Sequence, residues 1–252
     1  MIRSGSRIWL SACVHGYTIA GAVLGLAAVL QAAERSFDRA FVYLVLALVI
    51  DVTDGRLARA VGVAEHTPTV DGERLDALVD FVTFAVAPVV IAAEADLLPA
   101  PSFFWAAAMI ASSLIRFAGR PAKSDGCYSR FPNVWNIIVL YAYYLRWSPM
   151  LVGTIIVVVI VLMVLPGHYP HPSKHPTRQA HLVVATLAIG VAASVPLGIL
   201  PTRPWLLLSL VYPAFYVGQT VWLASGIRRL LHGPRRWFLM ITGNYQRAEC
   251  TA

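Results

Sequence analysis

Residues 51–81 read DVTDGRLARAVGVAEHTPTVDGERLDALVDF, and they hold seven of the 13 acidic residues in a chain of 252. In the first part of this stretch, Asp51, Asp54 and Ala58 are spaced i, i+3 and i+7, which places them on one face of a helix. Gly55 lies on the same face. The spacing therefore predicts a helix that carries two neighbouring carboxylates with little side-chain bulk beside them.

The second part of the stretch predicts a matching helix. Gly72, Asp76 and Asp80 recur every four residues and so share one face. Residues 67–69 (Thr-Pro-Thr) interrupt the chain between the two helices. Helices joined by so short a connection lie side by side, so the four carboxylates are predicted to converge. The remaining acids of the stretch are interpreted as solvated loop residues: Glu65, Asp71 and Glu73.

The composition of the whole chain is that of a membrane protein. Apolar residues make up 58% of the chain and charged residues 13%, and the mean hydropathy is +0.66. Soluble domains average about 45–50% apolar and about 25% charged residues. A soluble globule could not cover its surface with so few charges, and the same figures exclude disordered and collagen-like chains. The three cysteines are too far apart to indicate a disulfide framework or a zinc site.

Eight apolar stretches are candidates for helices that cross a bilayer, which takes about 20 residues. They cover roughly residues 8–31, 38–58, 74–94, 101–118, 132–146, 149–166, 180–199 and 204–225. The predicted fold class is therefore an all-α, polytopic membrane bundle of about eight transmembrane helices. We expect one membrane domain over residues 1–230 and a basic tail over residues 231–252. The loop over residues 168–181, rich in His and Pro, is predicted to be flexible.

The basic residues predict the orientation of these spans. With the N-terminus in the cytoplasm, the 20 Lys and Arg all fall on the cytoplasmic side except Arg35, Arg39, Arg146 and Arg203. Because cytoplasmic loops of membrane proteins are enriched in Lys and Arg, both termini are predicted to be cytoplasmic. The net charge of +7 is explained by these loops, and no nucleic-acid partner is expected.

Four carboxylates at the membrane boundary require cations. A charge within the bilayer costs about 3 kcal/mol even on the mildest scale, and carboxylates that face one another also repel. An all-oxygen site suits a hard divalent ion, which can be Mg²⁺, Mn²⁺ or Ca²⁺, and two such ions can share one set of carboxylates. The predicted metal ligands are Asp51, Asp54, Asp76 and Asp80.

The small and basic residues beside these acids predict a phosphate-bearing substrate. Gly55, Ala58 and Gly72 leave room for a large group to approach the helix backbones. Arg59 lies one turn beyond Gly55, where a guanidinium can hold a diphosphate through paired hydrogen bonds.

Together these residues read D-x2-D-G-x2-A-R-x12-G-x3-D-x3-D from Asp51 to Asp80, which resembles the signature of the CDP-alcohol phosphatidyltransferase family. The resemblance implies a membrane-embedded enzyme that cleaves a CDP-alcohol with divalent metal and passes the phosphoalcohol to a hydroxyl. The twelve-residue gap, the eight spans and residues 131–136 (FPNVWN) resemble the bacterial phosphatidylcholine synthase branch of that family. The likeness covers roughly residues 8–230.

The resemblance also implies a role for each site residue. Asp51, Asp54 and Asp76 would hold one Mn²⁺ or Mg²⁺ ion. Asp51, Asp76 and Asp80 would surround a second ion, and Asp80 would be the catalytic base that takes the proton of the attacking hydroxyl. Arg59 would hold the diphosphate. The implied partners are CDP-diacylglycerol and choline, within the membrane lipid of a bacterial inner membrane. The family also suggests a homodimer.

The candidates for the choline site are aromatic or polar residues. A quaternary ammonium is usually bound by aromatic rings, so Tyr128, Phe131 and Trp135 are candidates. His15 and Thr18 are polar residues spaced i, i+3 in the first span. They are predicted either to face the substrate or to form helix–helix hydrogen bonds.

Other functions stay open on the sequence alone. Inositol, glycerol phosphate or serine are alternative acceptors. An intramembrane prenyltransferase would need two Asp clusters far apart in the sequence, and a cation transporter lined by the same acids usually has inverted repeats. The sequence shows neither feature. Release of CMP from CDP-diacylglycerol would distinguish the transferase from the transporter.

Overall fold

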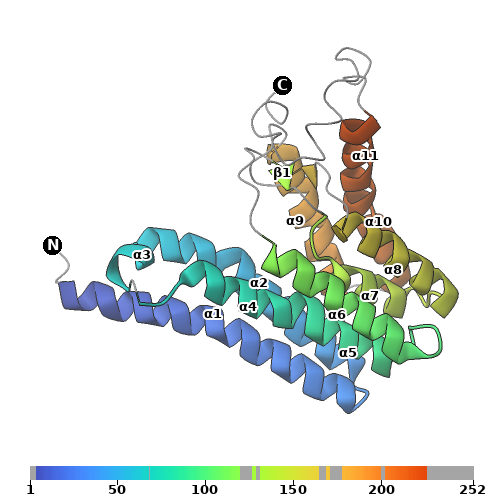
Figure 1. Cartoon of the computed structure of the whole chain (residues 1–252), viewed down its shortest axis with the longest axis horizontal. Coiled ribbons are helices and arrows are strands. Elements are labelled where there is room, and N and C mark those ends of the chain that lie inside the picture. The colour runs from blue at the N-terminus through green and yellow to red at the C-terminus, as the bar shows by residue number, and fades with distance from the viewer. Residues whose placement is uncertain are drawn as a thin grey trace. The chain divides into compact units, whose positions relative to one another are not determined.

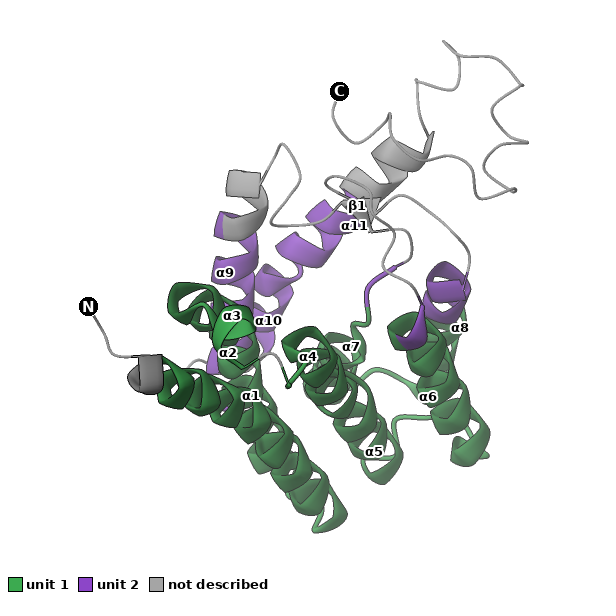
Figure 2. Cartoon of the chain, turned by 60° about the vertical axis from the view of Figure 1, so that its left-hand side comes forward, with its two compact units in different colours: residues 1–117, 133–157 green, residues 118–132, 158–252 purple. Residues whose placement is uncertain are grey.

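The computed structural model describes residues 4–67, 69–119, 127–128, 131–164, 169–170, 178–199 and 202–225. These residues form two compact units (Figure 2). Unit 1 comprises residues 1–117 and 133–157, and unit 2 comprises residues 118–132 and 158–252. The predicted boundary between residues 230 and 231 lies outside the described residues and stays a prediction.

Unit 1 is built from helices that follow one another closely in sequence. They are α1 (Ser4–Ala33), α2 (Phe37–Val61), α3 (Val63–His66), α4 (Gly72–Phe81), the π-helical η1 (Val82–Val86), α5 (Ala87–Glu94), most of α6 (Ser102–Ala118), α7 (Trp135–Tyr144) and the first half of α8 (Pro149–Val164). Unit 2 contains the rest of α8, the paired two-residue strands β1 (Cys127–Tyr128) and β2 (Tyr169–Pro170), and the helices α9 (Arg178–Ser194), α10 (Thr202–Ser209) and α11 (Val211–Ser225).

The helical fold class is confirmed, since a helix or a run of helices lies within each of the eight predicted spans. The eighth span is wrong as a continuous helix, because the chain turns at Leu210 between α10 and α11. Pro213 has no N–H to donate to the carbonyl of Ser209, which weakens a helix at this point. Among the described helices, two are long and apolar enough to cross a membrane, over residues 7–33 and 72–94. The number of crossings stays a prediction.

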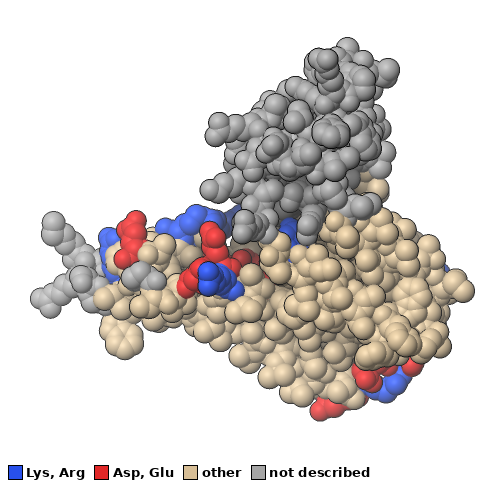
Figure 3. Space-filling view, in the orientation of Figure 1, with Lys and Arg blue, Asp and Glu red and all other residues tan. Residues whose placement is uncertain are grey.

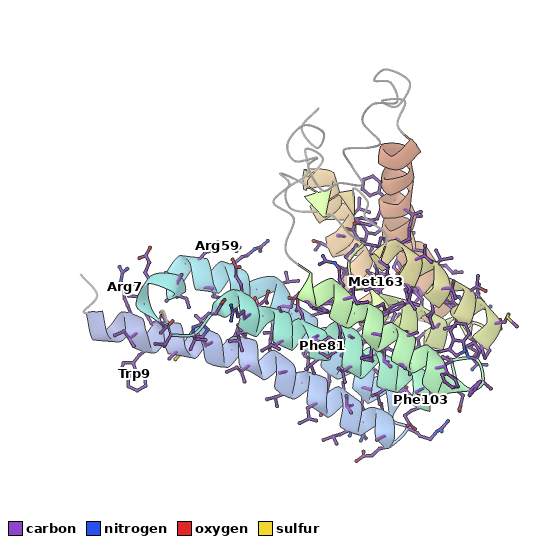
Figure 4. The ribbon with its side chains drawn as sticks, viewed as in Figure 1. Arg7, Trp9, Arg59, Phe81, Phe103 and Met163 are labelled. Carbon is purple, nitrogen blue, oxygen red and sulfur yellow. The ribbon has the colours of Figure 1, made fainter. Side chains whose placement is uncertain are left out.

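The outer surface of unit 1 is apolar, as expected for a protein surrounded by lipid. On α1, Trp9 is 76% exposed, and Val23 and Leu26 also face outward. Trp9 projects away from the neighbouring helices (Figure 4). On the face in Figure 3, charged side chains gather mainly towards two ends, with an almost uncharged band between them.

Helix α1 is the element against which the site is assembled. It lies along α2 and also contacts α4, η1 and α5 (Figure 1). Two of its glycines allow this approach. A Cβ at Gly21 would lie 3.0 Å from Cγ1 of Val79, and a Cβ at Gly25 would lie 2.8 Å from Cγ1 of Val82. Small residues four apart commonly permit close packing of membrane helices.

A stability prediction follows from Gly25. Gly25→Ala places a methyl group in contact with the π-helical segment and should destabilise unit 1 by about 1–3 kcal/mol, the usual cost of overpacking. Gly16→Ala is the matched control on the same helix, since nothing lies within 4 Å of a Cβ there. Thermal unfolding in detergent should show a lower Tm for Gly25→Ala alone. Equal Tm values for both variants would contradict the close approach.

The two helices that carry the acids have well-defined ends. Helix α2 stops at Gly62, which has φ +73° and donates its N–H to the carbonyl of Ala58 at 3.0 Å. A glycine adopts this left-handed conformation without steric cost. Helix α4 begins after Asp71, whose carboxylate accepts the N–H of Arg74 at 3.1 Å and pairs with its guanidinium at 2.9 Å. Asp71 is therefore an N-cap and lies outside the acid cluster.

The helix that starts at Gly72 continues through a π-helical turn to Glu94. At the end of that turn, Ala87 donates its N–H to the carbonyl of Val82, five residues earlier. Pro88 follows and has no N–H. The hydrogen bond from that position would be absent in an α-helix as well, so the wider turn loses little hydrogen bonding there. Such turns are frequent near functional sites, and this one starts two residues after Asp80.

Candidate active site

Three of the four predicted metal ligands come together in unit 1. One carboxylate oxygen from each of Asp51, Asp76 and Asp80 lies within 4.8 Å of the other two. Asp51 belongs to α2, and the other two belong to α4. All three residues are half-buried. The convergence predicted from the two helix faces is therefore present for these three side chains.

This arrangement of oxygens fits a hard divalent cation. Oxygen ligands around one Mg²⁺ ion lie about 3–4 Å apart, so small side-chain rotations would bring the three carboxylates to ligand spacing. Among the described residues, none of the three forms an ion pair with Lys or Arg. Three half-buried carboxylates without a protein cation repel one another, and a bound metal would relieve that repulsion. A donor set of carboxylates alone is typical of Mg²⁺ or Mn²⁺.

Asp54 lies outside this group of three, although it shares the predicted helix face. It is only 6% exposed, and its Oδ2 accepts a hydrogen bond of 2.9 Å from the hydroxyl of Thr18 on α1. Among the described residues, no donor meets its other oxygen, Oδ1. The structure thus connects α1 directly to one of the predicted metal ligands.

Two further side-chain hydrogen bonds connect α1 to the acid-bearing segment. His15 Nε2 lies 3.1 Å from Oγ1 of Thr67, and the hydroxyl of Tyr17 lies 2.8 Å from Oγ1 of Thr53. Of the two interpretations of His15 and Thr18, the structure has helix–helix hydrogen bonds, while their role in an acceptor site stays a prediction. Sequence reasoning missed the partners on both sides. No feature of the sequence indicates these pairings, because a polar side chain in an apolar helix does not specify which neighbour it will meet.

The predicted substrate-binding residues lie beside the acids. Arg59 is exposed near the C-terminal end of α2 (Figure 4), and its guanidinium extends back over Gly55. A Cβ at Gly55 would lie 3.4 Å from Nη1 of Arg59. Gly72 faces α1, since a Cβ there would lie 3.8 Å from Cε1 of His15. Ala58 is half-buried on the same helix as Arg59. Their roles in binding remain predictions.

The aromatic candidates for the acceptor site lie in different surroundings. Trp135, in unit 1, is fully buried and donates its indole N–H to the hydroxyl of Ser113 at 2.9 Å. Phe131, in unit 2, is buried with its ring centroid 6.1 Å from that of Tyr216. Tyr128 pairs through its backbone with Tyr169, and its side chain lies outside the described part of the structure.

Comparison with known protein families gives the site a chemical context. Residues 15–166 match the family model described as CDP-alcohol phosphatidyltransferase. The chain belongs to the CDP-alcohol phosphatidyltransferase family. The match contains all four aspartates, Arg59 and the small residues next to them. The predicted family is therefore confirmed, and with it a membrane-embedded class of metal-dependent transferases.

Among individual proteins of the CDP-alcohol phosphatidyltransferase family, the chain is similar to several that are named phosphatidylcholine synthase. The chain is 35% identical over 163 residues to the phosphatidylcholine synthase of Bradyrhizobium diazoefficiens, covering 64% of this chain and 61% of the relative. It is 32% identical over 212 residues to that of Rhizobium meliloti, covering 81% and 86%. It is 37% identical over 163 residues to that of Rhizobium johnstonii, covering 64% and 67%. The predicted resemblance to phosphatidylcholine synthases is confirmed.

Proposed function

We propose that this protein transfers the phosphatidyl group of CDP-diacylglycerol to choline and releases CMP. The observation that carries the proposal is the convergence of Asp51, Asp76 and Asp80 inside the family's motif. The similarity to proteins named phosphatidylcholine synthase supports choline as the acceptor. Inositol, glycerol phosphate and serine are the alternative acceptors, and an Asp-lined cation transporter is the remaining alternative of another class.

The proposed reaction is an in-line substitution at phosphorus, in which each site residue has a separate role. The choline oxygen forms a bond to the phosphorus of the phosphatidyl group, and the bond between that phosphorus and the oxygen of CMP breaks. Asp80 takes the hydroxyl proton as general base. Arg59 binds the diphosphate, and Gly55, Ala58 and Gly72 leave room for the nucleotide.

The residues that would hold the metal are the four aspartates. We assign Asp51, Asp54 and Asp76 to one Mn²⁺ or Mg²⁺ ion and Asp51, Asp76 and Asp80 to a second. Bound there, such ions would neutralise the charge that develops on the diphosphate as CMP leaves. Two observations support this assignment. The donor set consists of oxygens alone, and among the described residues no Lys or Arg forms an ion pair with the converging carboxylates.

The proposal includes the setting of the enzyme. It would cross a bacterial inner membrane about eight times, with both termini in the cytoplasm, and the expected assembly is a homodimer. His15, Thr18, Tyr128, Phe131 and Trp135 remain the candidates for the acceptor site. The apolar outer face of α1 supports the membrane setting.

An acceptor panel tests the proposed function. Purified protein is incubated with CDP-diacylglycerol, Mn²⁺ and, in separate reactions, labelled choline, inositol, glycerol phosphate and serine. We expect labelled phosphatidylcholine from choline, with one CMP released per lipid formed. If another alcohol gives a lipid product and choline gives none, that alcohol is the acceptor and the proposal of choline is wrong. No CMP with any alcohol would reject the transferase.

Arg59→Lys should weaken CDP-diacylglycerol binding more than it slows chemistry. Lysine keeps the charge but cannot make the paired hydrogen bonds of a guanidinium. The loss of one charge-assisted hydrogen bond, about 1.5 kcal/mol, corresponds to a KM that rises roughly tenfold. Arg56→Lys is the matched control, because Arg56 is exposed on the same helix and is interpreted as a membrane anchor. Equal KM values for the two variants would remove Arg59 from the diphosphate site.

A further inference from the structure

The hydrogen bond between Thr18 and Asp54 is the most informative contact around the site that the proposed function does not use. Both residues are buried, with 7% and 6% of their surfaces exposed. The hydroxyl lies 2.9 Å from Oδ2 of Asp54 and 3.4 Å from the carbonyl of Val14. Thr18 has a single hydroxyl proton, and the shorter contact is with the carboxylate of the neighbouring helix.

This use of a threonine hydroxyl differs from the usual one in a membrane helix. A threonine within a helix commonly donates a hydrogen bond from its hydroxyl to the carbonyl four residues earlier on the same helix. Thr83 does so with Val79 at 3.1 Å, and Thr154 does so with Met150 at 3.0 Å. In the case of Thr18, the corresponding contact is the longer one, so the hydroxyl is directed towards Asp54.

The consequence for Asp54 is a fixed carboxylate. A buried carboxylate needs hydrogen bonds to offset its loss of hydration, and Thr18 supplies one to Oδ2. The bond restrains rotation of the carboxylate group and leaves Oδ1 available, since no described residue donates to it. Groups that hydrogen-bond a metal-binding carboxylate in this way orient it and influence metal affinity.

We infer that Thr18 is a positioning residue of the metal site, which holds Oδ2 of Asp54 so that Oδ1 can bind the ion. The inference rests on the proposed function, because it takes Asp54 as a metal ligand. It moves Thr18 from the candidates for the choline site to a role beside a metal ligand, Asp54. Helix α1 then contributes to catalysis by orienting a ligand that α2 carries.

The test measures metal binding directly. Purified protein in detergent is titrated with Mn²⁺, and free Mn²⁺ is followed by electron paramagnetic resonance. Thr18→Val has nearly the same shape but no hydroxyl, and it should raise the Kd for Mn²⁺ roughly tenfold or more. Thr18→Ser keeps the hydroxyl and should bind Mn²⁺ as the wild type does. Thr18→Ala is measured in place of the valine variant if that protein does not fold.

Tyr17→Phe is the matched control. It removes a hydroxyl that joins the same two helices one residue earlier, and the partner of that hydroxyl is Oγ1 of Thr53, at 2.8 Å, instead of a carboxylate. A general loosening of α1 against α2 would weaken Mn²⁺ binding in Tyr17→Phe and Thr18→Val alike, and that result would overturn the inference. An unchanged Kd for Mn²⁺ in Thr18→Val, or an altered KM for choline alone, would also overturn it.

The same titration separates the inference from the proposed function. If the wild-type protein binds no Mn²⁺, the proposed metal site itself is rejected. If the wild type binds Mn²⁺ and Thr18→Val binds it equally well, only the role of Thr18 is rejected. Weaker binding in Thr18→Val, with wild-type binding in Thr18→Ser and Tyr17→Phe, supports the inference.

Discussion

Asp80→Asn is expected to abolish phosphatidyl transfer while CDP-diacylglycerol still binds. The asparagine oxygen can still face the metal site, but the amide cannot take a proton from the attacking hydroxyl. Loss of a general base typically costs about 10²–10⁴-fold in rate. The measurement is kcat for CMP release, together with the Kd for CDP-diacylglycerol from equilibrium binding.

Glu73→Gln provides the matched control for this substitution. Glu73 lies on the same helix, α4, and is exposed in its first turn, so the same loss of a carboxylate there should leave kcat unchanged. Turnover of Asp80→Asn near the wild-type rate would remove Asp80 from the role of base. Loss of CDP-diacylglycerol binding in Asp80→Asn would instead assign this residue to holding the substrate.

Asp51→Asn is expected to abolish both metal binding and transfer. Asp51 is the carboxylate of α2 that meets Asp76 and Asp80, and the proposal gives it to both ions. Removing a group that hydrogen-bonds a metal ligand typically lowers metal affinity or activity by roughly 10–100-fold. Removing the ligand Asp51 itself should lower both by more. Mn²⁺ binding and Mn²⁺-dependent CMP release are the two measurements.

Asp38→Asn is the control on the same helix. Asp38 accepts a hydrogen bond from the hydroxyl of Tyr144 at 2.8 Å, and the oxygen of asparagine can accept it as well. This variant should therefore bind Mn²⁺ and turn over as the wild type does. Wild-type Mn²⁺ affinity in Asp51→Asn would show that the three converging carboxylates are not the metal site.

Much of this fold could be predicted because apolar length and charge placement decide where membrane helices run. The predicted spans all contain helical segments, and the break after α2 follows from Gly62 and the Thr-Pro-Thr sequence. The break between α10 and α11 was missed, because a proline near the start of a helix and one inside a helix look the same within a continuous apolar run.

The acid cluster was predictable as a set of helix faces but not as a set of contacts. Asp51 and Asp54 are three residues apart, which rotates their side chains by about 60° around a helix of 3.6 residues per turn. Both fall on one broad face, yet Asp51 meets α4 whereas Asp54 meets α1. The periodicity of one helix does not specify which neighbour each side of its polar face will touch.

The role of α1 could not be assigned from the sequence for the same reason. His15 and Thr18 are recognisable as polar residues in an apolar span, but their partners lie 52 and 36 residues away. Only the packing of α1 against α2, with its close approach to η1 at Gly25, specifies those partners.

The most direct test of the whole account is choline-dependent release of CMP by metal-stripped protein. Protein treated with a chelator and then dialysed is given CDP-diacylglycerol and choline, and CMP and phosphatidylcholine are measured before and after Mn²⁺ is added. We predict neither product without metal, and equal amounts of both once Mn²⁺ is present. Full transfer in the continued presence of the chelator, or CMP release that does not depend on choline, would contradict the account.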